Sequence, residues 1–404
     1  MIRKHVHVFL FSFLGIWLSV SARAQVPENK SDDGLMLLSD VEMQIASTDM
    51  LNSIYNYDFK LVDEHFLFLK EKYGWHPLPY FLRGLAEWWK IEAEIENESY
   101  DKGFIAYMDS SIRIAKGLYR IPNVKLEASF ILAASYAFKG RLLAERKSWR
   151  KAASYARKSL NYLEECREYN GLSPELQFGD GLYNYFAEWI PDNYPVLRPV
   201  MLFFRKGDRT KGIKQLRNVA NNAFFTRTEA QYFLLRILNI ERKNYLEGLH
   251  WSQYLHKSYP NNPVFHRYYA RMLYVNGRTK EMVPEAEEIL RRIDSGRFGY
   301  GSNAGRYAAF FLGDFYSSRM NDERAKFYYL RVLQFVHQNE YFHSGYHLYA
   351  LLGLEEIALR EGDKEQARVY YKKIRKYAKR KHHAYRHAKK VWKAYRKKSR
   401  RKRS

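Results

Sequence analysis

The chain contains 404 residues, of which 46% are apolar and 17% aromatic. This length corresponds to about two domains at roughly 150 residues each. The composition excludes a collagen-like, low-complexity or mostly disordered chain. A folded chain of this size buries a sizeable core without disulfides or a structural metal.

The formal net charge of +24 is concentrated at one end of the chain. Residues 372–404 contain 18 Lys and Arg residues and no Asp or Glu. When residues 1–24 are also set aside, residues 25–371 hold 47 basic and 44 acidic residues, a net charge of +3. This pattern predicts a basic tail that contacts something anionic, and it argues against a body with a general nucleic-acid-binding surface.

Residues 1–24 have the pattern of a secretory signal peptide. The basic start MIRKH precedes the 13-residue apolar run Val8–Val20, and Ala22 and Ala24 are small residues at the positions that a signal peptidase reads. We expect cleavage between Ala24 and Gln25 and an exported chain that is soluble afterwards. An uncleaved anchor is the alternative, although the run is shorter than the about 20 apolar residues of a membrane span.

Helical patterns follow this segment. Residues 25–50 form a lead-in, and residues 51–190 an N-terminal helical-repeat section. Pro77 and Pro79 open one helix there, because proline disrupts a helix interior. The three prolines within residues 191–206 predict a bend. No convincing alternating strand pattern is present.

The single cysteine excludes an intrachain disulfide. Cys166 lies in the expected helix LNYLEECREY. Free cysteine is among the most frequently buried residue types, so we expect a packed side chain here. A functional thiol is the alternative.

The clearest internal repeat spans two helices around residue 320. Leu312-Gly313, Tyr316, Ala325 and Tyr329 follow the spacing L-G-x2-Y … A-x3-F, with Tyr in place of Phe. Two short antiparallel helices pack closely only where small residues lie at their crossing. Gly313 and Ala325 are these small residues, and the larger side chains fill the space around them.

The same pattern recurs through the C-terminal section, residues 207–380. Its small or packing positions repeat at intervals of 34 to 43 residues: Gly212, Gly248, Met282, Ala325 and Ala367. Asn276-Gly277 and Gly362-Asp363 predict turns between paired helices. We expect Pro284 in the first turn of the helix after Gly277.

On these residues the chain resembles the tetratricopeptide repeat (TPR) superfamily over roughly residues 125–380, and more loosely over residues 50–124. The resemblance implies an all-α fold, a right-handed α-solenoid of TPR-like helix pairs with a basic C-terminal helical tail, residues 381–404. It also implies a concave groove that binds peptides or proteins, and no chemistry. The aromatic-rich segments LAEWWK, GDGLYNYF and NAFFTRTEAQYFL are similar to segments of exported TPR proteins of bacterial envelopes. This resemblance implies a periplasmic or outer-membrane-associated protein.

Most of the 67 aromatic residues are expected in the core, and a minority are expected to line the groove as anchors. The candidate groove aromatics fall in two stretches: Tyr183, Tyr185, Phe186, Trp189, Phe224, Phe225 and Tyr232.

No catalytic, cofactor-binding or metal-ligating set emerges. His343 and His347, and likewise His383 and His387, are spaced for a shared metal but lack a third ligand at a matching spacing. The glycines within residues 299–305 fit no phosphate-binding pattern, and we expect a flexible loop. Five glutamates form what we expect to be a solvated helix face: Glu87, Glu92, Glu94, Glu96 and Glu98. An enzyme with catalytic residues distant in sequence remains the alternative.

The tail combines an aromatic stripe with dense positive charge. Through residue 392 the stripe is typical of a helix that caps the last repeat, and a frayed, solvated end is expected beyond it. Ten residues are predicted to contact the anionic surface: Lys389, Lys390, Lys393, Arg396, Lys397, Lys398, Arg400, Arg401, Lys402 and Arg403.

We therefore expect an exported, non-enzymatic scaffold that binds an unidentified protein partner and needs no cofactor. Its tail would contact anionic lipid or lipopolysaccharide. Nucleic acid fits the charge equally well, but the signal peptide argues against it. In the alternative, the protein binds a membrane or envelope-polymer surface and the tail is the main functional element.

Overall fold

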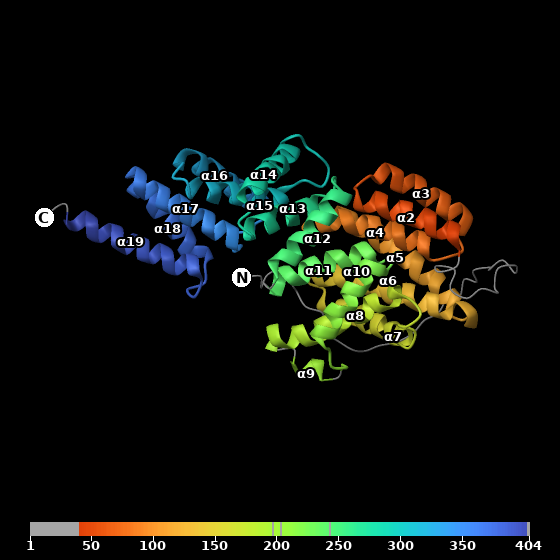
Figure 1. Ribbon diagram of the computed structural model, residues 1–404. Coiled ribbons are helices and arrows are strands. Elements are labelled where there is room, and N and C mark those ends of the chain that lie inside the picture. The colour runs from red at the N-terminus through yellow and green to blue at the C-terminus, as the bar shows by residue number, and fades with distance from the viewer. Residues whose placement is uncertain (1–39, 196–197, 203, 242–243, 402–404) are drawn as a thin grey trace. The chain divides into compact units, whose positions relative to one another are not determined.

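The computed structural model describes residues 40–401, except 196–197, 203 and 242–243 (Figure 1). Every regular element in this part of the chain is a helix, which confirms the predicted all-α class. No helix among the described residues is both long and apolar enough to cross a bilayer. The predicted cleavage site, Ala24 and Gln25, lies outside the described residues.

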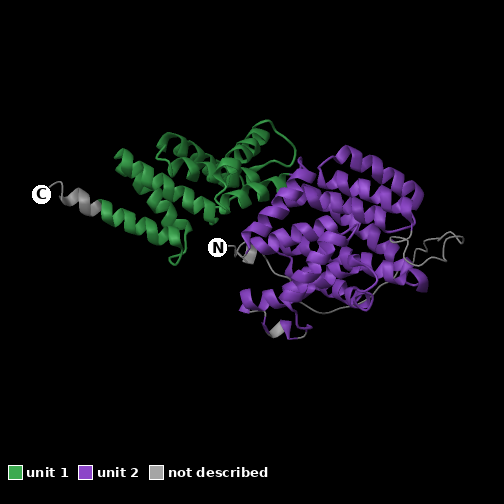
Figure 2. Cartoon of the chain, viewed as in Figure 1, with its two compact units in different colours: residues 1–4, 263–404 green, residues 5–262 purple. Residues whose placement is uncertain are grey.

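The chain divides between Asn262 and Pro263 into two compact units (Figure 2). Unit 2 is described from residue 40 to residue 262, and unit 1 from residue 263 to residue 401. The proline-rich segment, residues 191–206, lies inside unit 2.

Unit 2 is a succession of helices in which each packs mainly on its neighbours in the sequence. The longer helices are α2 (Val41–Tyr55), α3 (Phe59–Tyr73), α4 (Leu78–Ala93), α5 (Asp101–Leu118), α6 (Lys125–Glu145), α7 (Trp149–Arg167), α8 (Pro174–Asn193), α10 (Arg209–Asn222), α11 (Arg227–Glu241) and α12 (Tyr245–Ser258). The short ones are η1 (Glu98–Tyr100), η2 (Pro122–Val124) and α9 (Arg198–Met201).

Local sequence explains where these helices begin and how closely they approach. Pro77 and Pro79 flank the start of α4, as predicted. Gly212 of α10 faces α8 so closely that a Cβ would lie 2.7 Å from the carbonyl oxygen of Gly181. The predicted small position is therefore a close helix crossing. The predicted bend begins at Pro191, but α8 continues through this proline and ends at Asn193.

Contacts between distant parts of the sequence close unit 2 on itself. The indole Nε1 of Trp89 on α4 donates to Glu229 of α11 over 2.9 Å. The side chain of Asn262 donates to the carbonyl oxygen of Tyr55 at the end of α2 over 2.8 Å. These bonds bring the last helices of the unit against its first ones.

Unit 1 repeats a helix-turn-helix pattern. Its helices are α13 (Pro263–Val275), α14 (Thr279–Asp294), α15 (Ser302–Ser317), α16 (Asp322–Gln338), α17 (Gly345–Glu361), α18 (Lys364–Tyr377) and α19 (His383–Arg401). Gly277 and Gly362 have φ of +68° and +82°, a region that favours glycine, and they lie at the two predicted turns. Asp363 caps α18 by accepting from the backbone N–H of Gln366 over 2.9 Å. α13, α15 and α17 also contact one another in order.

The packing of unit 1 depends on glycines at helix crossings. A Cβ on Gly313 of α15 would lie 2.6 Å from the ring of Tyr329, and one on Gly353 of α17 would lie 2.4 Å from it. Tyr329 of α16 is therefore held between two glycines. Gly305, predicted in a flexible loop, lies within α15 against the ring of Phe335.

One helix boundary differs from the expectation. Pro284 lies inside α14, beyond its first turn, because α14 begins at Thr279. Its missing N–H removes one hydrogen bond to the preceding turn.

Candidate functional site

The last two helices of unit 1 carry many exposed basic residues. α19 contacts both α17 and α18, and its Ala384 and Ala388 are completely buried. The ring of Trp392 stacks on Tyr371 of α18 at 5.4 Å, with an interplanar angle of 11°. This contact supports the prediction that the aromatic stripe caps the last helices. The exposed residues that define the basic surface are Lys372, Lys373, Arg375, Lys376, Lys379, Arg380, Lys381, Arg386, Lys389, Lys390 and Lys393.

The predicted anionic-contact residues are only partly visible. Lys389, Lys390 and Lys393 are exposed. Five others belong to the last turns of α19, and their side chains are not described: Arg396, Lys397, Lys398, Arg400 and Arg401. Lys402 and Arg403 lie outside the described residues. The helix itself continues to Arg401, whereas the sequence predicted fraying after residue 392, because Lys, Arg and Ala are good helix formers.

Three of the candidate groove aromatics are core residues. Tyr185, Trp189 and Tyr232 are buried, at 0%, 6% and 0% exposure, so none of them presents a surface to a partner in this structure. Phe224 is exposed at 46%. The remaining three, Tyr183, Phe186 and Phe225, are half-buried.

Tyr183 makes its contacts within unit 2. Its hydroxyl donates to the backbone carbonyl of Arg205 over 2.7 Å, and the guanidinium of Arg205 lies 4.5 Å from the centre of the tyrosine ring. Arg205 in turn donates to the buried Asp180 over 2.8 Å. This aromatic residue therefore fixes the chain after α9 to α8.

The predicted solvated face of five glutamates is wrong for Glu87 and Glu92 of α4, whereas Glu96 and Glu98 are exposed and Glu94 is half-buried. Glu87 is 6% exposed and pairs with Lys90 and Arg83. Glu92 accepts from Arg141 of α6 over 2.6 Å and pairs with Arg236 of α11. For Glu92 the prediction failed because other helices supply cations from residues far away in the sequence, whereas the partners of Glu87 lie on α4 itself.

Glu229 of α11 is another buried carboxyl group of unit 2. Burial raises its pKa to about 7, against hydrogen bonds from Trp89 and Tyr55 that lower it. Glu92 pairs with two guanidinium groups, whereas Glu229 accepts from Trp89 and Tyr55, so the two carboxyls have different environments. That difference is found in acid–base pairs of enzymes. Glu229 is only 5% exposed, however. Neither Glu92 nor Glu229 lines the surface depression between α2 and α3 or the one beside Tyr259.

Glu175 of α8 has a structural role. Its carboxylate accepts from the backbone N–H groups of Phe225 and Thr226 over 2.8 and 2.9 Å, and from the hydroxyl of Thr226 over 2.6 Å. These N–H groups lie at the start of α11, where carboxylates bind favourably. Glu175 thereby joins α8 to the chain before α11.

Three histidines of unit 1, His343, His347 and His387, contact neighbouring residues of the same unit. His347 is buried, which lowers its pKa to about 4, and its Nδ1 lies 2.6 Å from the carbonyl oxygen of Phe342. His343 Nδ1 lies 2.7 Å from the carbonyl oxygen of Tyr377. His387 pairs with Glu356 over 3.1 Å. In these two i, i+4 pairs, His343, His347 and His387 therefore each make a separate contact.

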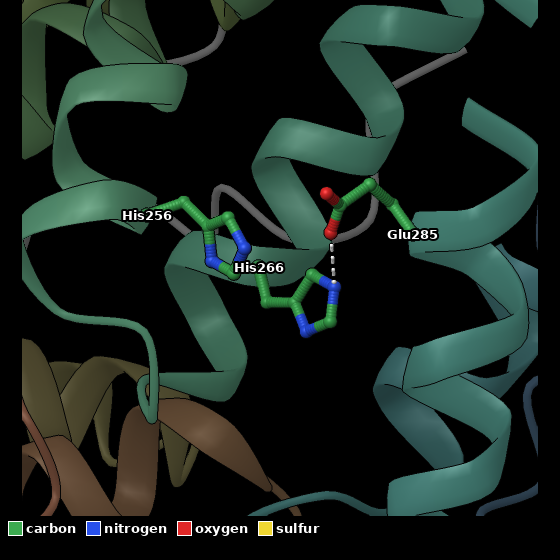
Figure 3. A group of neighbouring side chains, drawn as sticks. All are labelled: His256, His266 and Glu285. Carbon is green, nitrogen blue, oxygen red and sulfur yellow. Dashed lines mark ion pairs between the residues drawn. The ribbon is translucent and has the colours of Figure 1, made fainter. Parts of the chain in front are cut away.

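His266 of α13 is fully buried. Figure 3 shows its ion pair with Glu285 of α14, with Nε2 and Oε2 2.8 Å apart. Its Nδ1 lies 3.0 Å from the hydroxyl of Tyr300, and Arg292 donates to the same hydroxyl over 2.7 Å. This chain of contacts fastens the segment before α15 to α13 and α14. The third residue drawn, His256, belongs to unit 2.

A cluster of arginine and tyrosine lies where α13, α15 and α17 adjoin. Its members are Arg267 and Arg271 of α13, Arg306 and Tyr307 of α15, and Tyr346 of α17. The guanidinium carbons lie 5.7, 5.8 and 5.5 Å from the centre of the Tyr307 ring for Arg267, Arg271 and Arg306, respectively. The Tyr346 ring centre lies 4.9 Å from that of Tyr307.

This arginine–tyrosine cluster was not predicted from the sequence. Arg267 and Arg271 are one helical turn apart in FHRYYARMLYV, which places them on one face of α13. That spacing was visible in the sequence. The neighbouring aromatic residues had been assigned to the core, and their approach from α15 and α17 depends on the tertiary fold.

No protein-family model matches the chain, and no curated protein is found to be related to it.

Proposed function

We propose that the protein is an exported, non-enzymatic scaffold, built as a right-handed solenoid of TPR-like helix pairs, that mediates protein–protein interaction and contacts an anionic surface through its basic tail. Three features support the solenoid: sequential helix contacts, glycine turns between paired helices, and small residues at the crossings. The signal-peptide pattern supports export to the periplasm or the outer membrane.

The single observation that carries the surface contact is the way in which α19 is mounted. Ala384 and Ala388 are buried against the preceding helices, whereas Lys389, Lys390 and Lys393 are exposed. Residues 372–404 contain no carboxylate side chain to neutralise them. Each Lys or Arg near an acidic membrane contributes about 1 kcal/mol, and salt screens this attraction.

The test is binding of the mature chain to vesicles. Phosphatidylglycerol vesicles are compared with phosphatidylcholine vesicles by co-sedimentation at low and high salt. Lys389→Gln with Lys390→Gln removes two charges, and we expect it to weaken binding about 30-fold, the equivalent of about 2 kcal/mol. Lys60→Gln with Lys102→Gln, two exposed residues of unit 2, is the matched control. Equal binding by both double variants would refute the tail's role.

A crosslinking pull-down from the native envelope separates the scaffold from the alternative. Charge variants are better than truncation here, because removing α19 uncovers surface on α17 and α18. If Lys389→Gln with Lys390→Gln retains the partner that the unaltered chain captures, the scaffold proposal stands. If capture is lost with these charges and with salt, the tail is the main functional element.

A further inference from the structure

An apolar depression lies between α2 and α3, the first two long helices of unit 2, which pack side by side (Figure 1). Four apolar residues line it: Val41, Ile45 and Ala46 of α2, and Phe68 of α3. Val41, Ile45 and Phe68 are exposed at 65%, 57% and 46%. Large apolar side chains that are exposed together in this way mark a surface that binds something apolar.

The depression belongs to the first helix pair of the described chain. Among the described residues, α2 and α3 pack mainly on each other and on α4. In a stack of helix pairs, the terminal pairs need a covering element with a polar outer face. At the other end of the chain α19 packs on both α17 and α18 and covers the last pair in this way. The first pair has no such cover within the part of the chain that the structure describes.

The chain enters α2 at one end of this depression. Asp40 has φ of −83° and ψ of 99°, which is extended, and its side chain caps α2 by accepting from the backbone N–H of Met43 over 2.9 Å. The hydroxyl of Tyr73, the last residue of α3, donates to the same carboxylate over 3.2 Å. The residues before Asp40 therefore join the structure beside Val41, near the start of α2 and the end of α3.

The segment before α2 contains one apolar run. Residues 25–39 lie outside the described residues, and their chemistry is read from the sequence. Leu35, Met36, Leu37 and Leu38 are consecutive, and residues 34–39 carry no charge. Such a run can enter an apolar depression without burying a charge.

The run also has a suitable length and position. Four extended residues span about 13 Å. α2 rises about 12 Å from Val41 to Asp49, the last of its residues that lines the depression. Ser39 and Asp40 leave two residues in which the chain can turn back. With that reversal Leu38 would lie near Val41, and Leu35 near Asp49.

We propose that residues 35–38 of this same chain fill the depression between α2 and α3, running back along α2, and so cap the first helix pair. This contact goes beyond the proposed scaffold function and does not depend on the basic tail. It fixes the lead-in segment to unit 2. It also withholds the apolar face of α2 and α3 from other copies of the chain and from other proteins.

The test is the rate at which a maleimide labels a cysteine placed in the depression of the full mature chain. Ala46→Cys puts a small thiol among the lining residues. Leu172→Cys, at a side chain of unit 2 that is 63% exposed and does not line the depression, is the matched control. The natural Cys166 is 1% exposed, so its labelling reports unfolding of unit 2 in the same sample.

Polar substitutions in the run should open the depression. We expect Leu37→Ser with Leu38→Ser to raise the labelling rate of Ala46→Cys at least about tenfold and to leave that of Leu172→Cys unchanged. Val26→Ser changes an apolar residue of the same segment outside the run, and it should alter neither rate. If the double variant exposes Cys166, Leu37→Ser alone takes its place.

A disulfide gives a second, direct measurement. Leu37→Cys with Ile45→Cys should form a bond within one chain under mild oxidation, and mass spectrometry of tryptic peptides detects it. A bond between two chains in its place, or a labelling rate of Ala46→Cys that falls as the chain concentration rises, would show that a second copy fills the depression.

Three results therefore overturn the proposal. The first is coverage by a second copy. The second is an Ala46→Cys labelling rate that is the same with and without the leucines of the run. The third is protection of Ala46→Cys that appears only when an envelope extract is added, because a separate protein would then be the occupant.

Discussion

The fit of Tyr329 between two glycines leads to a quantitative prediction for unit 1. In Gly313→Ala the new Cβ would lie 2.6 Å from the tyrosine ring, well inside the 3.4 Å of ordinary contact. The ring cannot retreat, because Gly353 on its other side would already be 2.4 Å from it if it carried a Cβ. Overpacking of this kind costs about 2–3 kcal/mol, whereas Ala gains about 1 kcal/mol over Gly in a helix.

We therefore expect Gly313→Ala to destabilise the α15–α16 pair by about 1–2 kcal/mol. The matched control is Gly117→Ala on α5, where a Cβ meets nothing within 4 Å. That substitution is expected to stabilise its helix by about 0.5–1 kcal/mol. Hydrogen exchange read by mass spectrometry resolves the two helices separately, and a change of 1.4 kcal/mol alters protection about tenfold.

Replacing the tyrosine shows whether the ring is the cause. In a Tyr329→Leu background the contact is smaller, so Gly313→Ala should become neutral or stabilising. The double-mutant cycle of Gly313→Ala and Tyr329→Leu should then yield an interaction energy of about 2 kcal/mol. If Gly313→Ala raises protection of α15 as Gly117→Ala does for α5, the small residue is not required by the crossing and the reasoning is wrong.

Three further outcomes follow from buried groups. Because burial raises the pKa of Glu355 to about 8, its ionisation disfavours the folded state, and the stability of unit 1 should fall as the pH rises from about 4.5 to about 8. Glu355→Gln should flatten this fall, by on the order of a few kcal/mol in urea titrations across that range. Glu175→Ala leaves the N–H groups of Phe225 and Thr226 without their acceptor, and should lower the stability of unit 2 by about 3 kcal/mol in urea unfolding, with Glu175→Gln losing less. Cys166 is 1% exposed and burial raises its pKa to about 12, so a thiol reagent should label it only when unit 2 unfolds; rapid labelling of the native chain would contradict this.

The local structure of this protein follows closely from its sequence. The turns at Gly277 and Gly362, the proline-flanked start of α4 and the buried Cys166 were all predicted, since each depends on neighbours a few residues away. The small residue at Gly313 was predicted for the same reason, because a close helix crossing requires it.

Features that depend on distant partners were decided by the tertiary structure alone. The sequence predicted that Glu92 on α4 is solvated, but in the structure Arg141 and Arg236 of other helices pair with it. Periodicity shows that one face of a helix is polar, but it does not show whether water or another helix covers that face. The arginine–tyrosine cluster of unit 1 is another case, because its charge arises where α13, α15 and α17 come together. Electrostatic potential depends on distances in space, and the sequence specifies those distances only through the complete fold.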